Sequence, residues 1–243
     1  MGDLRDAHRR NIAAWSEAAD ELQTFGDEGD FARRYLLNPT IFALAGTLTG
    51  KRILDAGCGE GYLSRMLARR GALVTGVEPA TRLYELCAQY ERSEPLGIDY
   101  INCDLVDMAP PERQFDLVIA NMALMDIPDY QAAIHMLATL TQREGHVIIT
   151  LSHPCFEEPG ASWPQKRAVQ TDEYFAMYER PQRFGALYHR PLSAYVNRLL
   201  EEGLTLRRMV EPRLPDGVTR DGNDRDAHVP SFIALYAQRV DTP

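Results

Sequence analysis

The spacing of hydrophobic positions divides the chain into stretches of different character. In residues 1–48 apolar residues recur at helical spacing, and a polar break at 26–30 separates two expected helices, 5–23 and 31–48. From residue 51 onward, short apolar runs alternate with helical segments. We therefore expect an N-terminal helical cap, followed by an α/β core.

The alternating stretch predicts a parallel sheet. Its expected strands are residues 52–55, 73–78, 98–103, 115–121 and 146–151, and its expected helices are 62–70, 81–91 and 129–140. Strands that alternate with helices are joined by right-handed crossovers, which place helices against the faces of the sheet.

The periodicity disappears over residues 156–190, which are rich in proline and aromatic residues. A loop of this length is usually functional or disordered, and its aromatic content favours an ordered lid. Helical spacing returns at 192–202, and apolar runs at 204–210 and 231–240 predict a closing antiparallel strand pair. We expect one domain, made of the cap at 1–48, the core at 50–155, the lid insertion at 156–190 and the C-terminal helix and strand pair at 191–243.

Composition narrows the functional classes. The chain of 243 residues is 45% hydrophobic and 25% charged, as in globular proteins, and its net charge of -9 argues against a nucleic-acid partner. Its 4 cysteines are widely spaced, which indicates a reducing cytoplasm and neither a disulfide framework nor a metal site. No signal-peptide pattern and no apolar run of membrane-spanning length is present. We expect a cytoplasmic monomer or homodimer that acts on a small molecule, without nucleic acid, membrane or metal.

The sharpest local motif is a glycine-rich turn after the first expected strand. Residues 53–62 read ILDAGCGEGY, with Asp55 at the end of the strand and a G-x-G-x-G turn behind it. Glycine allows a sharp turn and a close approach of the backbone to a ligand at the carboxyl edge of a sheet. The second strand ends at Glu78, where a carboxylate is placed to accept hydrogen bonds from two ribose hydroxyls. Together, the two features predict a nucleoside cofactor.

A dinucleotide fits this turn poorly. The dinucleotide motif has a small residue where this chain has Tyr62, and the carboxylates of Asp55 and Glu60 would oppose a pyrophosphate. A ligand that carries an amine and a sulfonium suits these acids better. A nicotinamide-dependent oxidoreductase is therefore the least favoured alternative.

The D-x-G-x-G-x-G turn, the acid that ends the second strand, Asp104 after the third strand and the fourth strand at 115–121 together resemble class I S-adenosylmethionine-dependent methyltransferases. The resemblance covers roughly residues 50–155, and several flanking motifs are similar to a bacterial group of small-molecule methyltransferases. It implies a Rossmann-like α/β fold with a seven-stranded, mostly parallel sheet. The implied strand order is 3-2-1-4-5-7-6, with only strand 7 antiparallel and helices on both faces.

The resemblance also implies which residues would bind S-adenosylmethionine. The glycine turn would line the methionine part, Glu78 would hold the ribose, Asp104 would meet the adenine amino group, and an aromatic residue of the cap would close the pocket. The alternative for Asp104 is capping of the following helix, and Cys58 is expected to pack in the turn rather than act as a nucleophile. The implied cofactor-binding residues are Tyr35, Asp55, Ala56, Gly57, Cys58, Gly59, Glu78, Pro79, Asp104, Leu105, Asn121 and Met122.

Three residues outside the turn are candidates for contact with the substrate. His153 follows the fifth expected strand, where an imidazole could take a proton from the methyl acceptor or could hold the lid by hydrogen bonds. Tyr188 and His189 are candidate substrate-binding residues, with a structural role as the alternative.

These features together predict an S-adenosylmethionine-dependent methyltransferase with a biosynthetic role. The expected reaction moves a methyl group onto an O, N or C atom of a small-molecule metabolite by in-line displacement and leaves S-adenosylhomocysteine. The alternative from a different class is a non-catalytic protein that keeps the cofactor fold as a sensor or partner subunit, because a fold does not prove a function.

Overall fold

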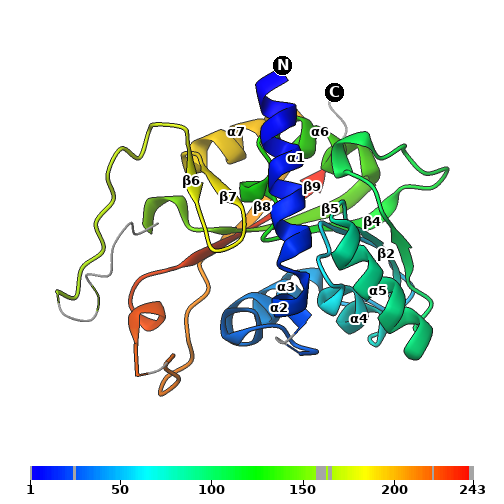
Figure 1. Ribbon diagram of the computed structural model, residues 1–243, viewed down its shortest axis with the longest axis horizontal. Helices are drawn as coiled ribbons and strands as arrows, with labels where there is room; N and C mark the ends of the chain where they lie inside the picture. Colours follow the sequence, from blue (N-terminus) through cyan, green and yellow to red (C-terminus); the bar gives the residue numbers. More distant parts are fainter. Residues whose placement is uncertain (1, 24–25, 157–162, 164–165, 221, 241–243) are drawn as a thin grey trace.

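The computed structural model describes residues 2–23, 26–156, 163, 166–220 and 222–240, and its centre is a seven-stranded sheet in the order β3-β2-β1-β4-β5-β9-β8 (Figure 1). The strands β1 to β5 pair in parallel, and β9 runs antiparallel to both of its neighbours. The expected order is confirmed, with β9 as its antiparallel strand. The strands are β1 Arg52–Ala56, β2 Leu73–Val77, β3 Asp99–Ile101, β4 Phe115–Asn121, β5 Thr141–Ser152, β8 Leu204–Val210 and β9 Phe232–Arg239.

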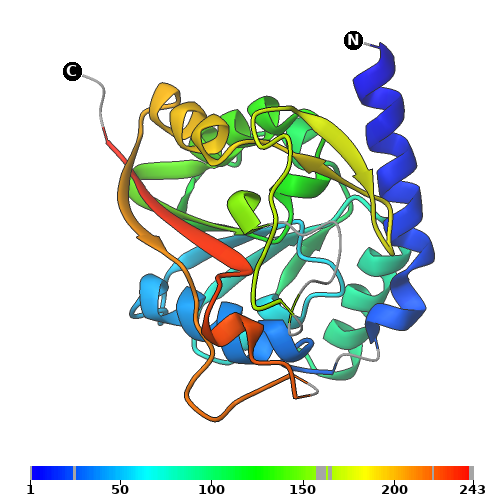
Figure 2. The ribbon, with the colours of Figure 1, turned by 90° about the vertical axis from the view of Figure 1, so that its left-hand side faces the viewer.

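Apolar side chains on both faces of the strands bury the sheet between two layers of helices. Ile53 packs with one apolar cluster and its neighbour Leu54 with the other, and Leu117 and Val118 of β4 divide in the same way. Parallel strands covered on both faces read as continuous apolar runs, and those runs are the signal in the sequence. Helices α6 (Tyr130–Leu140) and α7 (Leu192–Glu201) cover one face, and α3 (Asn38–Ala45) and α4 (Tyr62–Ala68) cover the other (Figure 2).

Local sequence sets where these helices begin. Pro39 lies in the first turn of α3, where its missing N–H leaves no hydrogen bond unmade. Gly61 precedes α4 with φ +81°, a conformation that L side chains rarely adopt. The carboxylate of Asp129 accepts a hydrogen bond from the backbone N–H of Ala132 (3.0 Å) and caps α6.

The N-terminal cap lies across the edge of these layers. Helix α1 (Gly2–Glu17) continues into α2 (Ala19–Leu22), and together they lie beside α5 (Thr81–Ser93) and the hairpin of β6 (Tyr178–Pro181) and β7 (Ala186–His189) (Figures 1 and 2). Ala18, Ala19 and Leu22 pack with Ala80 and Leu83 in an apolar cluster of their own. The cap therefore covers the sheet edge through apolar contact with α5.

The insertion after β5 contains an antiparallel hairpin that the sequence analysis did not predict. Its strands are β6 (Tyr178–Pro181) and β7 (Ala186–His189), and they form a sheet separate from the main one. Two further boundaries differ from expectation, because β5 begins at Thr141 directly after α6, and β3 is limited to three residues. The hairpin gives the insertion an ordered element that faces α1.

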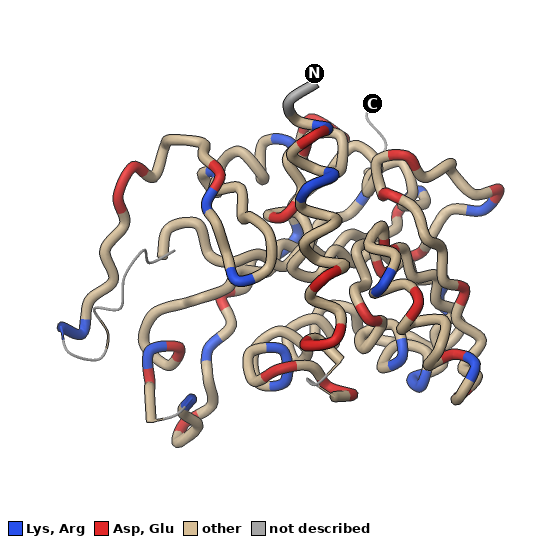
Figure 3. Tube along the Cα trace, viewed as in Figure 1, with Lys and Arg blue, Asp and Glu red and all other residues tan. Residues whose placement is uncertain are grey.

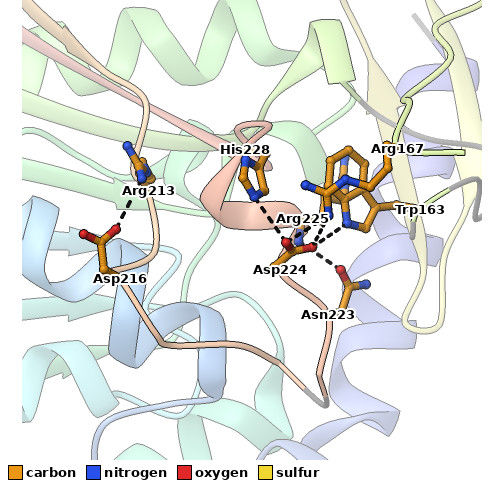
Figure 4. Close-up of polar contacts among 8 residues, drawn as sticks. All are labelled: Trp163, Arg167, Arg213, Asp216, Asn223, Asp224, Arg225 and His228. Atoms are coloured by element: carbon orange, nitrogen blue, oxygen red, sulfur yellow. Dashed lines mark hydrogen bonds and ion pairs between the residues drawn. The ribbon is translucent and has the colours of Figure 1, made fainter. Parts of the chain in front are cut away.

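A polar cluster joins Trp163 and Arg167 of the insertion to the loop between β8 and β9. Asp224 accepts hydrogen bonds from Nε1 of Trp163 (3.0 Å) and from Nη1 of Arg167 (2.8 Å), and it pairs with His228 (Figure 4). The Arg167 guanidinium also lies over the Trp163 ring. Two segments far apart in sequence are thus linked, and the aromatic content of the insertion is partly explained by this cluster.

Charged residues of both signs are interspersed along the trace (Figure 3). Many of them form exposed pairs, such as Arg69 with Glu94 and Arg82 with Asp20. Exposed pairs of this kind contribute little to stability. Among the described residues, no helix is long and apolar enough to cross a membrane.

Candidate functional site

A cavity that is partly open to solvent lies at the carboxyl ends of β1, β2 and β4 under helix α1. This is the edge of an open α/β sheet at which ligands bind. The residues around it come from the cap, the glycine turn and the segments that follow β2 and β4. They are His8, Asn11, Ile12, Trp15, Leu22, Arg33, Asp55, Gly57, Cys58, Gly59, Glu60, Tyr62, Leu63, Glu78, Pro79, Leu83, Asn121, Met122, Ala123, Asp126 and Ile127.

The glycine turn brings backbone to the wall of the cavity. The N–H groups of Gly57 and Cys58 both donate to the carbonyl of Val77 (2.8 and 3.0 Å), which holds the turn against the end of β2. Gly57 has φ +73°, and a Cβ there would lie 2.8 Å from that of Ala123. Gly59 has φ +60°, and a Cβ there would meet nothing within 4 Å. A side chain at 59 would therefore extend into open space at the wall of the cavity.

Two buried carboxyl groups stand beside this turn. Glu78 accepts hydrogen bonds from the N–H groups of Gly59 and Ala80, both at 2.9 Å, and Asp55 accepts one from Oγ of Ser64 (2.7 Å). Burial raises the pKa of each carboxyl to about 7, against these hydrogen bonds, which lower it. A positively charged ligand would favour the ionised form of both groups, so their environment suits a cation.

A chain of hydrogen bonds fixes the tip of β4. Nδ2 of Asn121 donates to the hydroxyl of Tyr62 (2.7 Å), and Oγ1 of Thr150 donates to Oδ1 of Asn121 (2.7 Å). The N–H of Met122 donates to the same Thr150 oxygen (3.0 Å), and Met122 itself has φ +58°. A bulky residue in this conformation is strained, and such strain concentrates at functional sites.

Helix α1 forms the cover of the cavity. Asn11 is buried, and its side chain bonds both to the backbone of Ala186 in β7 and to the carbonyl of Asp126. Nε2 of His8 lies 2.6 Å from Oδ2 of Asp104. Within the described residues Nδ1 of His8 is buried without a hydrogen-bond partner. Asn11 thus links α1 to the insertion, and His8 links α1 to the segment that follows β3.

The structure brings most of the predicted cofactor residues to one place. Ala56 is buried at the end of β1 beside the cavity, and Leu105 is buried in a 3-10 turn, η3 (Leu105–Asp107). Asp104 caps that turn by accepting from the N–H of Val106 (3.2 Å) while it bonds to His8, so the capping alternative describes one of its two contacts. The predicted residues that line the cavity are Asp55, Gly57, Cys58, Gly59, Glu78, Pro79, Asn121 and Met122.

Two predicted cofactor contacts behave as packing groups. Tyr35, in the π-helical turn η2 (Arg33–Leu37), lies against the ring of Phe31 (centroids 4.8 Å apart) and does not line the cavity, whereas Arg33 of the same turn does. Cys58 is buried beside Cys87, and this contact together with burial raises the pKa of its thiol well above the usual value. A thiol held protonated agrees with its expected role as a small residue packed in the turn.

The predicted substrate-side residues lie outside the lining of the cavity. His153 is buried, its Nε2 lies 2.9 Å from Glu211, and its Nδ1 accepts from the N–H of Cys155 (3.2 Å). His189 is buried, bonds to the carbonyl of Tyr174 (3.0 Å) and stacks on Tyr178. These contacts correspond to the structural alternative for both histidines, because their ring nitrogens are engaged away from the cavity.

Tyr188 lies on β7 beside the cover, although it is not part of the cavity lining. Burial raises the pKa of its hydroxyl, and Asp126 is one of the charges that act on it. Of the three predicted substrate-side residues, Tyr188 is therefore the one whose hydroxyl pKa is influenced by Asp126, a residue that lines the cavity.

The residues that sequence reasoning missed lie mainly on α1. His8, Asn11, Ile12 and Trp15 line the cavity and follow the i, i+3, i+4, i+7 spacing of one helical face. A histidine and an asparagine inside an otherwise apolar stripe were the available signal. Asp126 was also missed, because it lies in a short turn after β4, outside the glycine turn and the strand ends. Among the described residues, no cluster of three or more His, Cys, Asp or Glu side chains could hold a metal ion.

Comparisons with known proteins agree with this arrangement. Residues 54–149 match the family model described as a methyltransferase domain. A ubiquinone biosynthesis O-methyltransferase of Alkalilimnicola ehrlichii is 30% identical over 151 residues, which cover 60% of this chain and 60% of that protein. The corresponding protein of Coxiella burnetii is 29% identical over 145 residues, which cover 58% of this chain and 61% of that protein. The similarity therefore spans about three fifths of the curated relatives.

Solved structures share the fold. An S-adenosylmethionine-dependent methyltransferase of Mesorhizobium loti superimposes with a TM-score of 0.74 at 24% identity, over 83% of this chain and 96% of that one. The 1,6-didemethyltoxoflavin-N1-methyltransferase of Burkholderia thailandensis, solved with its substrate and S-adenosylhomocysteine, gives 0.66 at 16% identity, over 98% of this chain and 91% of that one. The expected methyltransferase fold is thus confirmed.

Proposed function

We propose that this chain, whose residues 54–149 form a class I S-adenosylmethionine-dependent methyltransferase domain, transfers a methyl group to an O, N or C atom of a small-molecule metabolite. One observation carries the proposal. The glycine turn, Asp55 and Glu78 meet at the wall of one cavity, and the position of a Cβ at Gly59 is open space. The names of the curated relatives favour an oxygen acceptor and a biosynthetic role.

The carboxyl groups at the wall of the cavity suit the binding of S-adenosylmethionine. Glu78 has one carboxylate oxygen on each of two backbone N–H groups and retains lone pairs for ribose hydroxyls. Asp55 is buried at the end of β1 and would balance the charge of the amine. The cofactor supplies a methyl group on a positively charged sulfur, already activated for displacement. The acids that oppose a dinucleotide would stabilise such a cation.

The work left to the protein is positioning. The hydrogen-bonded tip of β4 and the turn at residues 57–59 hold one wall rigid, and α1 with Trp15 and Ile12 reduces the access of water to the cavity. In-line alignment of the acceptor with the methyl carbon can supply several kcal/mol of the barrier reduction, at most about 7–11 in well-oriented systems. No covalent intermediate with the enzyme is required.

A ligand comparison tests the proposal directly. S-adenosylhomocysteine at ~100 times its Kd should raise the Tm by roughly 5–10 °C, because selective binding to the native state adds about 2.7 kcal/mol. Oxidised and reduced nicotinamide dinucleotides should leave the Tm unchanged. A rise with a dinucleotide alone would contradict the assignment of the turn.

Substitution of the ribose carboxylate locates the binding. Glu78→Gln should weaken the binding of S-adenosylhomocysteine about 10- to 150-fold, since hydrogen bonds to a charged acceptor contribute about 1.5–3 kcal/mol. Glu85→Gln, an exposed position on α5, serves as the matched control and should leave the affinity unchanged. Calorimetry measures the affinities. Equal affinities in the wild type, Glu78→Gln and Glu85→Gln would show that Glu78 does not bind the cofactor.

A further inference from the structure

The cavity contains a carboxyl group that cofactor binding leaves unused. Asp126 ends the 3-10 turn η4 (Leu124–Asp126), which follows the tip of β4, and it lines the cavity together with its neighbour Ile127. The cofactor residues predicted from the resemblance lie in the glycine turn, behind β2 and β3 and at the tip of β4. Asp126 therefore belongs to the part of the wall that is available to a methyl acceptor.

The chain holds this segment by its backbone. Asn11 donates to the carbonyl of Asp126 (2.6 Å), and the buried guanidinium of Arg190 donates to the carbonyls of Leu124 (3.2 Å), Ile127 (2.6 Å) and Pro128 (2.9 Å). Within the described residues, the carboxylate oxygens of Asp126 receive no hydrogen bond. The position of the residue is thus fixed, while its acidic group remains free for a ligand.

Charges from every surrounding element act on this carboxyl. Burial raises the pKa of Asp126 well above its usual value, the cations Arg33 and Arg190 oppose that shift, and Glu78 adds to it. The other titratable groups around the cavity or next to Asp126 are His8, Asp55, Glu60, Tyr62 and Tyr188. Burial thus favours the protonated form of this carboxyl, and a positive charge in the cavity would favour its ionised form.

We propose that Asp126 gives up its proton when the positively charged methyl donor binds, and that its carboxylate then binds the O–H or N–H group of the acceptor and takes the acceptor's proton. This inference rests on the proposed function and narrows it to acceptors that carry a proton on oxygen or nitrogen. Trp15, Ile12 and Ile127 supply apolar surface around the same space, so the acceptor would combine such a group with an aromatic or apolar body.

The step balances without a further reactant. The acceptor oxygen or nitrogen forms a bond to the methyl carbon, the carbon–sulfur bond breaks, and its electron pair stays on sulfur as a neutral thioether. The acceptor's proton moves to the carboxylate of Asp126 and leaves to water after the products dissociate. A positioned general base of this kind typically contributes 10²–10⁴-fold to the rate.

Calorimetry of donor binding provides a test that needs no acceptor. Binding of S-adenosylmethionine and of S-adenosylhomocysteine is measured at pH 7 in phosphate and in Tris, whose ionisation enthalpies differ, so that the number of protons released is obtained. The wild type should release up to about one proton more with the sulfonium than with the thioether. Asp126→Asn should reduce this difference, and the part that remains comes from Asp55, Glu60 and Glu78, which the variant keeps.

Asp129→Asn is the matched control, because Asp129 is exposed three positions away and asparagine also caps helices. It should keep the wild-type difference in proton release. If Asp126→Asn releases protons as the wild type does, Asp126 is not the group that ionises, and the inference is wrong. Asp126→Ala repeats the test should the asparagine variant fold poorly. If the wild type binds neither ligand, the proposed function itself fails.

Turnover gives the second measurement. With catechol, 4-hydroxybenzoate and aniline as probe acceptors, any probe that the wild type methylates should be methylated 10²–10⁴-fold more slowly by Asp126→Asn. The Kd for S-adenosylhomocysteine should stay within about threefold of the wild-type value. The wild type should show a kcat that rises with pH as Asp126 ionises in the donor complex, and the variant should lose this rise. A variant with the same kcat and the same pH profile would contradict the role of Asp126 as a base.

Discussion

The two walls of the cavity are built in different ways. At the sheet edge, Glu78 bonds to the N–H of Gly59, 19 residues away in sequence, and Asp55 bonds to Ser64, 9 residues away. In the cover, Asn11 bonds to Ala186 at a separation of 175 residues, and His8 meets Asp104 at a separation of 96. Contacts of short range are set by one motif, whereas contacts of long range exist only after the whole chain has folded. The edge is thus a property of a short sequence, and the cover is a property of the fold.

Removal of Arg190, which holds the segment after β4 beneath the cover, should have the largest effect. Arg190 is buried, donates to three backbone carbonyls and to the hydroxyl of Tyr195, and lies over the ring of Tyr130. Arg190→Met leaves those carbonyls without their donor, so we expect the free energy of unfolding to fall by about 3 kcal/mol. Urea denaturation measures the change.

Arg213→Met is the control for that measurement, because Arg213 pairs with Asp216 on the surface (Figure 4). Its loss should change the free energy of unfolding by less than about 0.5 kcal/mol. A loss for Arg190→Met as small as this would mean that the segment after β4 does not depend on Arg190.

A substitution at the sheet edge should lower chiefly the affinity for the ligand rather than the stability of the fold. Gly59→Val places a side chain in the open space of the cavity, so we expect the Kd for S-adenosylhomocysteine to rise at least about 100-fold, or about 2.7 kcal/mol. Gly217→Val is matched to it, since Gly217 also has a positive φ (+81°) and open space at its Cβ position, but lies in the loop between β8 and β9. Both variants carry about 1–2 kcal/mol of backbone strain. Only the first should lose the ligand, and equal affinities in calorimetry would contradict this.

The same division explains what the sequence could predict. The strand order, the glycine turn and Glu78 depend on apolar runs and on residues close together in sequence, and the structure places them as expected. His153 was selected because histidine suits proton transfer, and His189 was selected as a substrate contact, but residue type does not reveal which partners will engage an imidazole. In the fold, His153 bonds to Glu211 and His189 bonds to the carbonyl of Tyr174. Neither pairing leaves a pattern in the local sequence.

The cover was harder to predict for a related reason. The β6–β7 hairpin has strands of four residues that include Pro181 and Arg180, so their hydrophobic pattern is weak. The hairpin is ordered through its contact with α1, where the rings of Trp15 and Phe184 meet with centroids 5.7 Å apart. The sequence of α1 alone or of the hairpin alone does not reveal this contact, because the hydrophobic periodicity of one segment does not show which other segment it will pack against.

A double-mutant cycle can test how closely α1 and the hairpin fit. Asn11→Ala removes three buried hydrogen bonds and should lower the free energy of unfolding by about 2 kcal/mol. Gly185→Ala should also destabilise the protein, because a Cβ there would lie 2.0 Å from Oδ1 of Asn11. In the Asn11→Ala background that collision is absent, so Gly185→Ala should cost only its backbone strain of about 1–2 kcal/mol. Additive losses in urea denaturation would show that the two residues do not interact.

The smallest predicted effect concerns pH and returns to the sheet edge. Burial raises the pKa of Glu78 to about 7, so between pH 5 and pH 7 the native state holds a proton on this carboxyl that the unfolded state has already lost. The free energy of unfolding of the ligand-free protein should therefore fall as the pH rises through this range, with Glu78 contributing about 1.4 kcal/mol per pH unit. Above pH 7 its contribution to the slope should vanish, because both states are then ionised.

Glu78→Gln removes this titration, so its slope between pH 5.5 and 6.5 in urea denaturation should be shallower by that amount. Asp55 titrates in the same range and remains in the variant, which is why we expect a reduced slope rather than a flat profile. An unchanged slope would mean that the ligand-free sheet edge already stabilises the charge of Glu78.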